Sequence, residues 1–113
     1  ASAGFSPRYN APKDLSLRTK LAASLYRGGD ADAALAVLAE AQAIDCKDAN
    51  TLFNIGMIKW QGKGDAKGAL AAWQRLLKSN PEMSTERKAM VRQLVAEAQA
   101  TLARPPRMEG TGR

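Results

Sequence analysis

The sequence predicts an all-α fold in which five short helices follow one another between residues 15 and 103. Apolar residues recur three or four positions apart in five consecutive segments, which is the spacing of one helix face. Hydrophobic residues make up 45% of the 113 residues, and aromatic residues only 5%. Most of the apolar residues are Ala and Leu, a composition typical of helices that pack closely.

Each segment after the first begins next to a residue that can cap a helix. Asp30, Asp48, Asp65 and Ser84 precede the second to fifth segments, and their side-chain oxygens can accept the free N–H groups of a first turn. Short glycine turns separate several segments, so consecutive helices are expected to lie antiparallel and adjacent. In chain order the apolar positions are Leu17, Leu21, Ala22 and Leu25, then Ala34, Leu35, Leu38, Ala41 and Ile44, then Leu52, Ile55, Gly56 and Trp60, then Ala69, Leu70, Trp73, Leu76 and Leu77, and finally Met90, Val91, Leu94, Val95, Ala98 and Leu102.

Part of the sequence repeats at an offset of 35 residues. Asp-Ala-Asp-Ala-Ala-Leu at 30–35 aligns with Asp-Ala-Lys-Gly-Ala-Leu at 65–70, and the same offset places Leu38 on Trp73. A period of this length is typical of stacked helical hairpins, and the chain resembles the 34-residue tetratricopeptide repeat (TPR) with one extra residue near Gly62. The matching positions are Leu21, Ala22, Leu25, Ala34, Leu38 and Ala41 in the first repeat, and Leu52, Ile55, Gly56, Ala69, Trp73 and Pro81 in the second.

The TPR resemblance implies two helical hairpins and a closing helix, arranged as a short right-handed α-solenoid. The repeats cover residues 15–48 and 49–83, and the capping helix covers 84–103. The pattern places small residues, Gly56 and Ala69, where the two helices of the second hairpin cross, because larger side chains would force them apart. The capping helix is expected to turn a polar face outward, formed by Arg87, Lys88, Gln93 and Glu97.

Two residues depart from the TPR pattern. Lys59 stands where Tyr is usual, and Cys46 stands where the first repeat would have Pro. Cys46 is either a redox or tethering thiol or a small residue in a turn, and no partner that would stabilise its thiolate can be identified from the sequence. The Gly-Lys-Gly stretch at 62–64 also resembles the related Sel1-like repeat, although the remaining spacing is that of TPR.

The two ends of the chain are expected to be irregular. Residues 1–14 form an extended arm that carries Phe5 and Tyr9, and residues 104–113 form a basic tail. The small residues at 1–4 are typical of the region that follows signal-peptide cleavage. We therefore expect a periplasmic or extracellular protein, with the cytoplasm as the alternative.

The composition argues against most catalytic sites. Histidine is absent and Cys46 is the single cysteine, so a Ser-His-Asp triad, a His-ligated zinc and a thiolate cluster are excluded. No pair of carboxylates has a spacing that implies acid–base work, and we expect no enzymatic activity, cofactor or metal. The net charge of +6 favours anionic partners.

Nucleic acid is not an expected partner, and no membrane span is expected. Aromatic residues are not interleaved with Lys and Arg as they are in nucleic-acid-binding surfaces. No apolar run approaches the roughly 18 residues that a membrane span needs.

The TPR resemblance implies a binding groove along the first helix of each hairpin and the capping helix. Aromatic anchors ringed by polar donors suit a protein or peptide partner. Asn50 would bond a partner's backbone, and Lys88 and Arg92 would meet a carboxylate. Packing across helix junctions is the alternative role of the aromatic residues, whereas Trp73 is predicted to be core. The predicted partner-binding residues are Tyr26, Arg27, Asn50, Phe53, Met57, Trp60, Lys88 and Arg92, and the pattern also exposes Ser16 and Thr19 on the same face.

The segment from Ala71 to Pro81 resembles the second helix of small bacterial TPR proteins that serve c-type cytochrome maturation. This resemblance implies an extracytoplasmic partner, with a multihaem c-type cytochrome as a candidate. We expect a non-catalytic accessory or scaffold subunit that docks on a larger exported assembly. The alternative is a transient peptide-binding adaptor or assembly factor in c-type cytochrome biogenesis. The chain has no Cys-x-x-Cys-His site, so it would not carry a covalent c-type haem itself.

Overall fold

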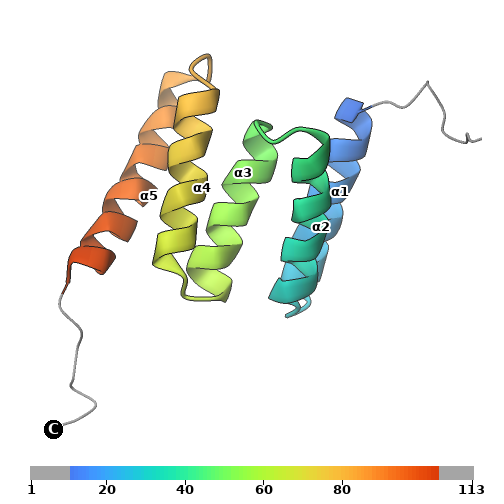
Figure 1. Ribbon diagram of the computed structural model, residues 1–113, viewed down its shortest axis with the longest axis horizontal. Helices are drawn as coiled ribbons and strands as arrows, with labels where there is room; N and C mark the ends of the chain where they lie inside the picture. Colours follow the sequence, from blue (N-terminus) through green and yellow to red (C-terminus); the bar gives the residue numbers. More distant parts are fainter. Residues whose placement is uncertain (1–10, 105–113) are drawn as a thin grey trace, which may run out of the picture.

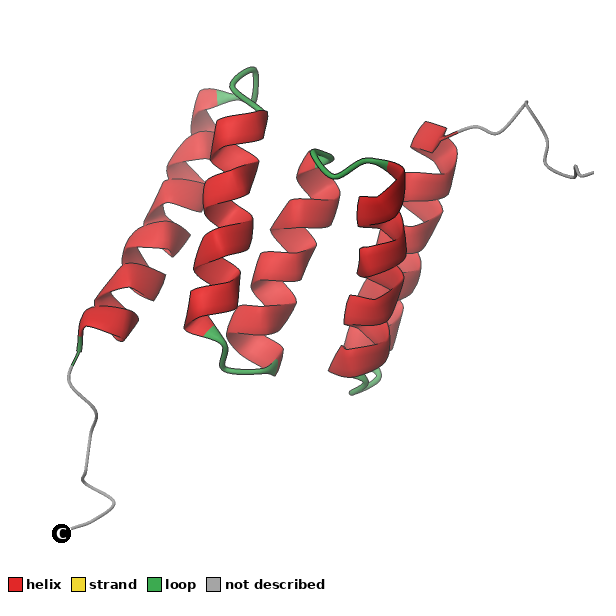
Figure 2. Cartoon of the chain, viewed as in Figure 1, coloured by secondary structure: helices red, strands yellow, loops and turns green. Residues whose placement is uncertain are grey.

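The all-α prediction is confirmed by the computed structural model, which describes residues 11–104, with side chains from residue 14. Neighbouring helices run antiparallel and form a row with α1 and α5 at its ends (Figure 1). The described residues contain no strand (Figure 2). The elements are α1 (Ala11–Arg27), α2 (Ala31–Ile44), α3 (Ala49–Met57), a π-helical turn η1 (Ile58–Gly62), α4 (Ala66–Ser79) and α5 (Thr85–Ala103).

The four predicted helix caps are confirmed. The Asp30 carboxylate accepts a hydrogen bond from the backbone N–H of Ala33 at 3.0 Å, and Asp48, Asp65 and Ser84 each accept the equivalent bond three residues on. Each side chain satisfies one of the N–H groups that a helix start leaves without a partner. A cap of this kind stabilises a helix by about 0.5–2 kcal/mol.

The first helix begins earlier than the sequence indicated. α1 starts at Ala11, within the stretch up to residue 14 that was expected to be an extended arm. Pro12 is compatible with this start, because the first turn of a helix does not use the backbone N–H that proline lacks. The rest of the expected arm and tail, 1–10 and 105–113, lies outside the described residues.

The buried side chains form two clusters, one for each half of the row. The first cluster joins α1, α2, α3 and the π-helical turn, and Ala72 of α4 reaches it. The second joins α3, α4 and α5 around Trp73, which is fully buried as predicted. The first consists of Ala22, Ala34, Leu38, Ile55, Ile58 and Ala72, and the second of Leu52, Ala69, Trp73, Leu76, Val91 and Ala98.

Helices α2 and α4 share the same features at the 35-residue offset. Each helix has 14 residues and an aspartate cap. The glycine before each cap, Gly29 or Gly64, has a positive φ, of 94° and 64°. L side chains rarely adopt this conformation, so glycine suits both turns.

The π-helical turn η1 lies between the two aligned helices and lengthens the α3 rod by one residue. Its backbone N–H groups bond one residue further back than in an α-helix, as Lys63 N does to the carbonyl of Ile58 at 3.2 Å. A π-turn therefore contains one residue more than an α-turn. The α-helix of α3 continues into η1 without a break, so Trp60 is carried on the same rod as Phe53.

Gly56 packs against the indole ring of Trp73. A Cβ atom at Gly56 would overlap the indole, and its three nearest neighbours would all be atoms of that ring. In the first hairpin, Ala22 corresponds to Gly56 and Leu38 corresponds to Trp73, and these two residues belong to one cluster. The second hairpin thus has a smaller residue on α3 and a larger one on α4. The sequence had paired Gly56 with Ala69, but the group that requires a glycine is Trp73.

Several apolar residues that helical spacing assigned to the core are exposed. Leu17 and Leu21 of α1 are exposed, and so are Met90 and Leu102 of α5. Among the described residues, no further helix packs on the outer side of α1 or of α5, so part of their apolar pattern meets solvent. Within residues 11–104, no helix combines the length and the apolar character needed to cross a membrane.

We expect the pair Gly56 and Trp73 to be strongly coupled in stability. Gly56→Ala should destabilise the fold by about 1–3 kcal/mol, because the added methyl group overlaps the indole ring. Trp73→Leu alone should cost about 2–5 kcal/mol by leaving a cavity. The double variant imitates the Ala22 and Leu38 pair, so it should be more stable than the sum of the two single effects predicts. Urea denaturation of the four proteins measures the coupling, and simple additivity would contradict the assignment.

Overpacking the first hairpin should also destabilise the protein. Ala34 is fully buried in the first cluster, and Ala34→Leu should lower the free energy of unfolding by about 1–3 kcal/mol. The exposed Ala36 on the same helix is the control, since Ala36→Leu adds the same atoms in contact with solvent. Equal melting temperatures for the two variants would contradict a close contact at Ala34.

Candidate functional site

Four residues of α3 and η1 form a continuous strip, which we call the α3 stripe: Asn50, Phe53, Met57 and Trp60. Their spacing of three, four and three residues places them on one side of the rod. Phe53, Met57 and Trp60 are each half-buried, and they pack on the second cluster beside Leu94 and Val95 of α5. The stripe therefore presents an apolar surface that the second cluster holds in place on its inner side and that is partly exposed to solvent on its outer side.

Arg87 of α5 closes one end of the α3 stripe. Its Nη2 donates a hydrogen bond to Oδ1 of Asn50 at 2.9 Å, and its guanidinium carbon lies 5.9 Å from the centre of the Phe53 ring. The second contact is a cation–π interaction, worth about 0.5–1 kcal/mol at an exposed site. The sequence had placed Arg87 on the outward polar face of the capping helix. That assignment is wrong, because Arg87 points toward α3.

A hollow of about 210 Å³ adjoins the stripe at Asn50. Two elements wall it: α1, through Ser16 and Thr19, and the turn between α2 and α3, through Asp45 and Asp48. Ser16 and Thr19 belong to the face that the TPR pattern exposes. Asn50 is thus shared between the hollow and the contact with Arg87, so one surface runs from α1 across α3 to α5.

The two aspartates of this hollow already hold the turn together. Asp48 accepts hydrogen bonds from the backbone N–H and the hydroxyl of Thr51, at 3.0 and 2.8 Å. Asp45 accepts one from the backbone N–H of Lys47 at 3.0 Å. Asp45 and Asp48 make the surface acidic on the α1 side of Asn50, whereas Arg87 makes it basic on the α5 side of Asn50.

Trp60 belongs to both the surface and the core. Its ring meets Trp73 edge to face, with centroids 6.1 Å apart and planes inclined at 61°. Such a contact is worth about 0.5–1.5 kcal/mol beyond the area that it buries. The two alternatives for Trp60, binding and packing, are thus compatible, since the face that does not touch Trp73 is partly open.

Tyr26 and Arg27 lie at the end of α1, apart from the α3 stripe. Tyr26 is half-buried beside the first cluster, and a Cβ atom at Gly62 would lie 2.8 Å from its ring carbon Cε1. The tyrosine therefore packs across the junction between α1 and the end of η1. Arg27 is exposed.

Lys88 and Arg92 stand one turn apart on α5. Lys88 is half-buried and Arg92 is exposed. Neither side chain makes an ion pair with another residue of the described segment. Their four-residue spacing places both charges on the same side of α5, where two cations can meet an incoming carboxylate.

Asn80 is a structurally important residue that the sequence treated only as a helix stop. Its side chain is buried and donates hydrogen bonds to the carbonyl groups of Lys47 at 2.9 Å and Leu76 at 3.2 Å. The first bond fixes the end of α4 to the turn that carries Asp45 and Asp48. Its position directly after α4 and before Pro81 was the available signal, but the acceptor lies 33 residues away.

Cys46 is exposed in the turn between α2 and α3. Among the residues that the structure describes, no three His, Cys, Asp or Glu side chains gather in a way that could hold a metal ion.

Removing the Asn80 side chain should destabilise the protein. Asn80→Ala should reduce the free energy of unfolding by about 1–3 kcal/mol, because one buried and one part-buried hydrogen bond are lost and the Lys47 carbonyl loses this donor. Asn54→Ala is the matched control, since the Asn54 amide bonds only the Asn50 carbonyl at a partly exposed position. Urea denaturation should show a much smaller effect for Asn54→Ala. Equal effects would contradict a special role for Asn80.

No protein-family model, curated protein or solved structure matches the chain. The resemblance to the tetratricopeptide repeat stays a prediction from this chain's own residues.

Proposed function

We propose that this protein is a non-catalytic protein–protein interaction module built from two TPR-type hairpins and a capping helix. Helices α2 and α4 have equal lengths, aspartate caps and glycine turns at the same 35-residue offset, and these shared features support the repeat assignment. So does the small residue on each preceding helix, Ala22 or Gly56, since both are buried. The proposed repeats are 15–48 and 49–83, and the short right-handed α-solenoid is closed by 84–103.

The α3 stripe is the observation that carries this proposal. It combines three half-buried large apolar side chains with Asn50 and Arg87, which are already paired before a partner arrives. Binding energy at protein interfaces concentrates in aromatic and Arg anchors with a polar surround. Since packing on the second cluster orders these anchors in advance, binding needs to order fewer side chains.

The partner that we propose is a larger exported assembly on which this chain docks as an accessory or scaffold subunit. A segment of that partner would place apolar side chains on Phe53, Met57 and Trp60, and a carboxylate between Lys88 and Arg92. The resemblance of Ala71–Pro81 to a helix of cytochrome-maturation proteins favours a multihaem c-type cytochrome and an extracytoplasmic site. A transient adaptor role uses the same surface and differs in how long the complex lasts.

A photo-crosslinking amino acid at Arg92 should capture the partner in extracts of the native source. The same group at Gln74, an exposed residue of α4 remote from the stripe, is the control. Mass spectrometry identifies the product, and a haem absorption band in it would identify a cytochrome. Equal capture from both positions would contradict binding at the α3 stripe.

The identified partner should bind the variant Trp60→Ala/Arg92→Ala at least about tenfold more weakly by titration calorimetry, which corresponds to about 1.4 kcal/mol. Circular dichroism should show unchanged helicity. Lys20→Ala/Gln74→Ala is the control, because both residues are exposed and lie on α1 and α4, outside the helices that carry Trp60 and Arg92. An unchanged affinity would show that the stripe is not the binding surface. A dissociation time of hours favours the accessory subunit, and one of seconds favours the adaptor.

A further inference from the structure

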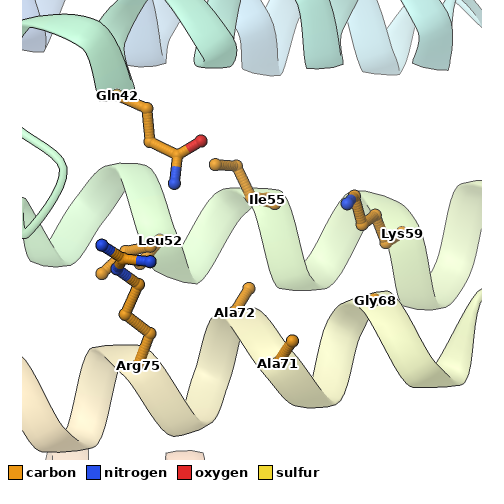
Figure 3. Close-up of a pocket in the computed structure, with 8 residues that line it drawn as sticks. All are labelled: Gln42, Leu52, Ile55, Lys59, Gly68, Ala71, Ala72 and Arg75. Carbon is orange, nitrogen blue, oxygen red and sulfur yellow. The ribbon is translucent and has the colours of Figure 1, made fainter.

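A second hollow lies between α2 and α4, with α3 as its floor (Figure 3). Its volume is about 190 Å³. Leu52, Ile55 and Lys59 contribute to it from α3 and η1. These residues lie on the side of the rod opposite the α3 stripe, since their positions are half a helical turn away from it. The hollow is thus separate from the surface on which the proposed function depends.

Three polar side chains extend toward this hollow. Gln42 descends from α2 and Arg75 rises from α4, so that the amide and the guanidinium point toward one another, while Lys59 lies at the other end beyond Ile55 (Figure 3). Within the described residues, the salt bridges and side-chain hydrogen bonds join other groups. The donors of Gln42, Lys59 and Arg75 are therefore available to a ligand.

The floor of the hollow and its α4 wall are basic. Between residues 49 and 81 there are five basic residues and one acidic residue, Asp65. The Asp65 side chain caps α4 by accepting the backbone N–H of Gly68 at 2.8 Å. Residues 14–48, by contrast, carry six acidic and four basic residues. The positive charge of the described chain is thus concentrated on the segment from α3 to α4, which forms the floor and one wall of this hollow. The other wall, α2, carries Asp32 and Glu40, and Asp32 pairs with Lys63.

The position of Lys59 depends on a glycine in the facing helix. A Cβ atom at Gly68 of α4 would lie 2.8 Å from Cδ of Lys59, so the lysine stem lies against the α4 backbone. Lys59 stands where the TPR pattern has Tyr. The exchange replaces an aromatic ring between the two helices by an aliphatic stem and a cation at the edge of the hollow.

We propose that this hollow binds an acidic segment of a protein partner, in which one apolar side chain enters between two carboxylates. The apolar side chain would rest on Ile55 and Ala72, one carboxylate would meet Arg75 and Gln42, and the other would meet Lys59. The volume is below the roughly 300–1,000 Å³ of sites for drug-sized ligands and cofactors, and it suits a single side chain. A protein segment fits better than nucleic acid, because the lining contains no aromatic ring on which a base could stack.

The test uses a nine-residue synthetic peptide with a central leucine, which is flanked on each side by two glutamates and then two glycines. Titrated into ¹⁵N-labelled protein, it should shift the backbone amide signals of Ile55, Ala71 and Ala72 more than those of Asn50 and Met57. Arg75→Gln and Lys59→Gln should each weaken binding about threefold, and the double variant about tenfold, because each removes one charge–carboxylate contact. Lys78→Gln is the matched control, since it removes an equal charge from an exposed site on α4 outside the hollow.

The opposing outcomes are distinct. An equal loss of affinity in Lys78→Gln would show that net charge alone attracts the peptide and would overturn the proposal. Shifts centred on Asn50 and Met57 would assign the peptide to the α3 stripe and overturn it as well. The proposal would also be overturned if an eight-nucleotide oligothymidylate shifted the same amide signals and bound more tightly than the peptide. The stripe variant Trp60→Ala/Arg92→Ala should retain the peptide's shifts at Ala71 and Ala72, so that the two surfaces can fail independently.

Discussion

The contact between Gly56 and Trp73 is the constraint on which the rest of the structure depends. Burial of an indole removes about 150–250 Å² from water and stabilises the fold by about 4–6 kcal/mol. The indole Nε1 of Trp73 has no hydrogen-bond partner among the described residues, which costs about 1–3 kcal/mol. The stabilisation from burying the ring exceeds this cost, so the ring stays buried, but only a glycine on α3 leaves room for it.

This contact fixes α3, and α3 carries both candidate surfaces. One side of the rod bears the α3 stripe with Phe53, and the opposite side forms the floor of the hollow between α2 and α4. A change in the distance between α3 and α4 would therefore alter both surfaces together. The π-helical turn extends the same rod to Gly62 and so brings Trp60 over the Trp73 ring. Core packing and surface geometry are thus set by the same few residues.

The ends of the row are less complete than its centre. α1 and α5 each cover a neighbour with one side and leave large apolar residues in solvent on another, Leu21 and Met90 among them. α5 nevertheless contributes more than a cover, because Arg87 reaches across to Asn50 and Phe53. The capping helix is in this way also part of the surface that we propose for binding.

The sequence by itself determined the all-α fold, the four helix caps and the burial of Trp73. These features depend on residues three or four positions apart, and their spacing is visible in the chain. The tertiary structure alone decided that Gly56 faces Trp73, that Arg87 turns inward, and that Asn80 bonds the carbonyl of Lys47. Each of these contacts joins residues 17 to 37 positions apart, and the choice between neighbouring residues on one helix face depends on how two helices are rotated against each other. Helical periodicity fixes which side of a helix is buried, but not which atom on the next helix it meets.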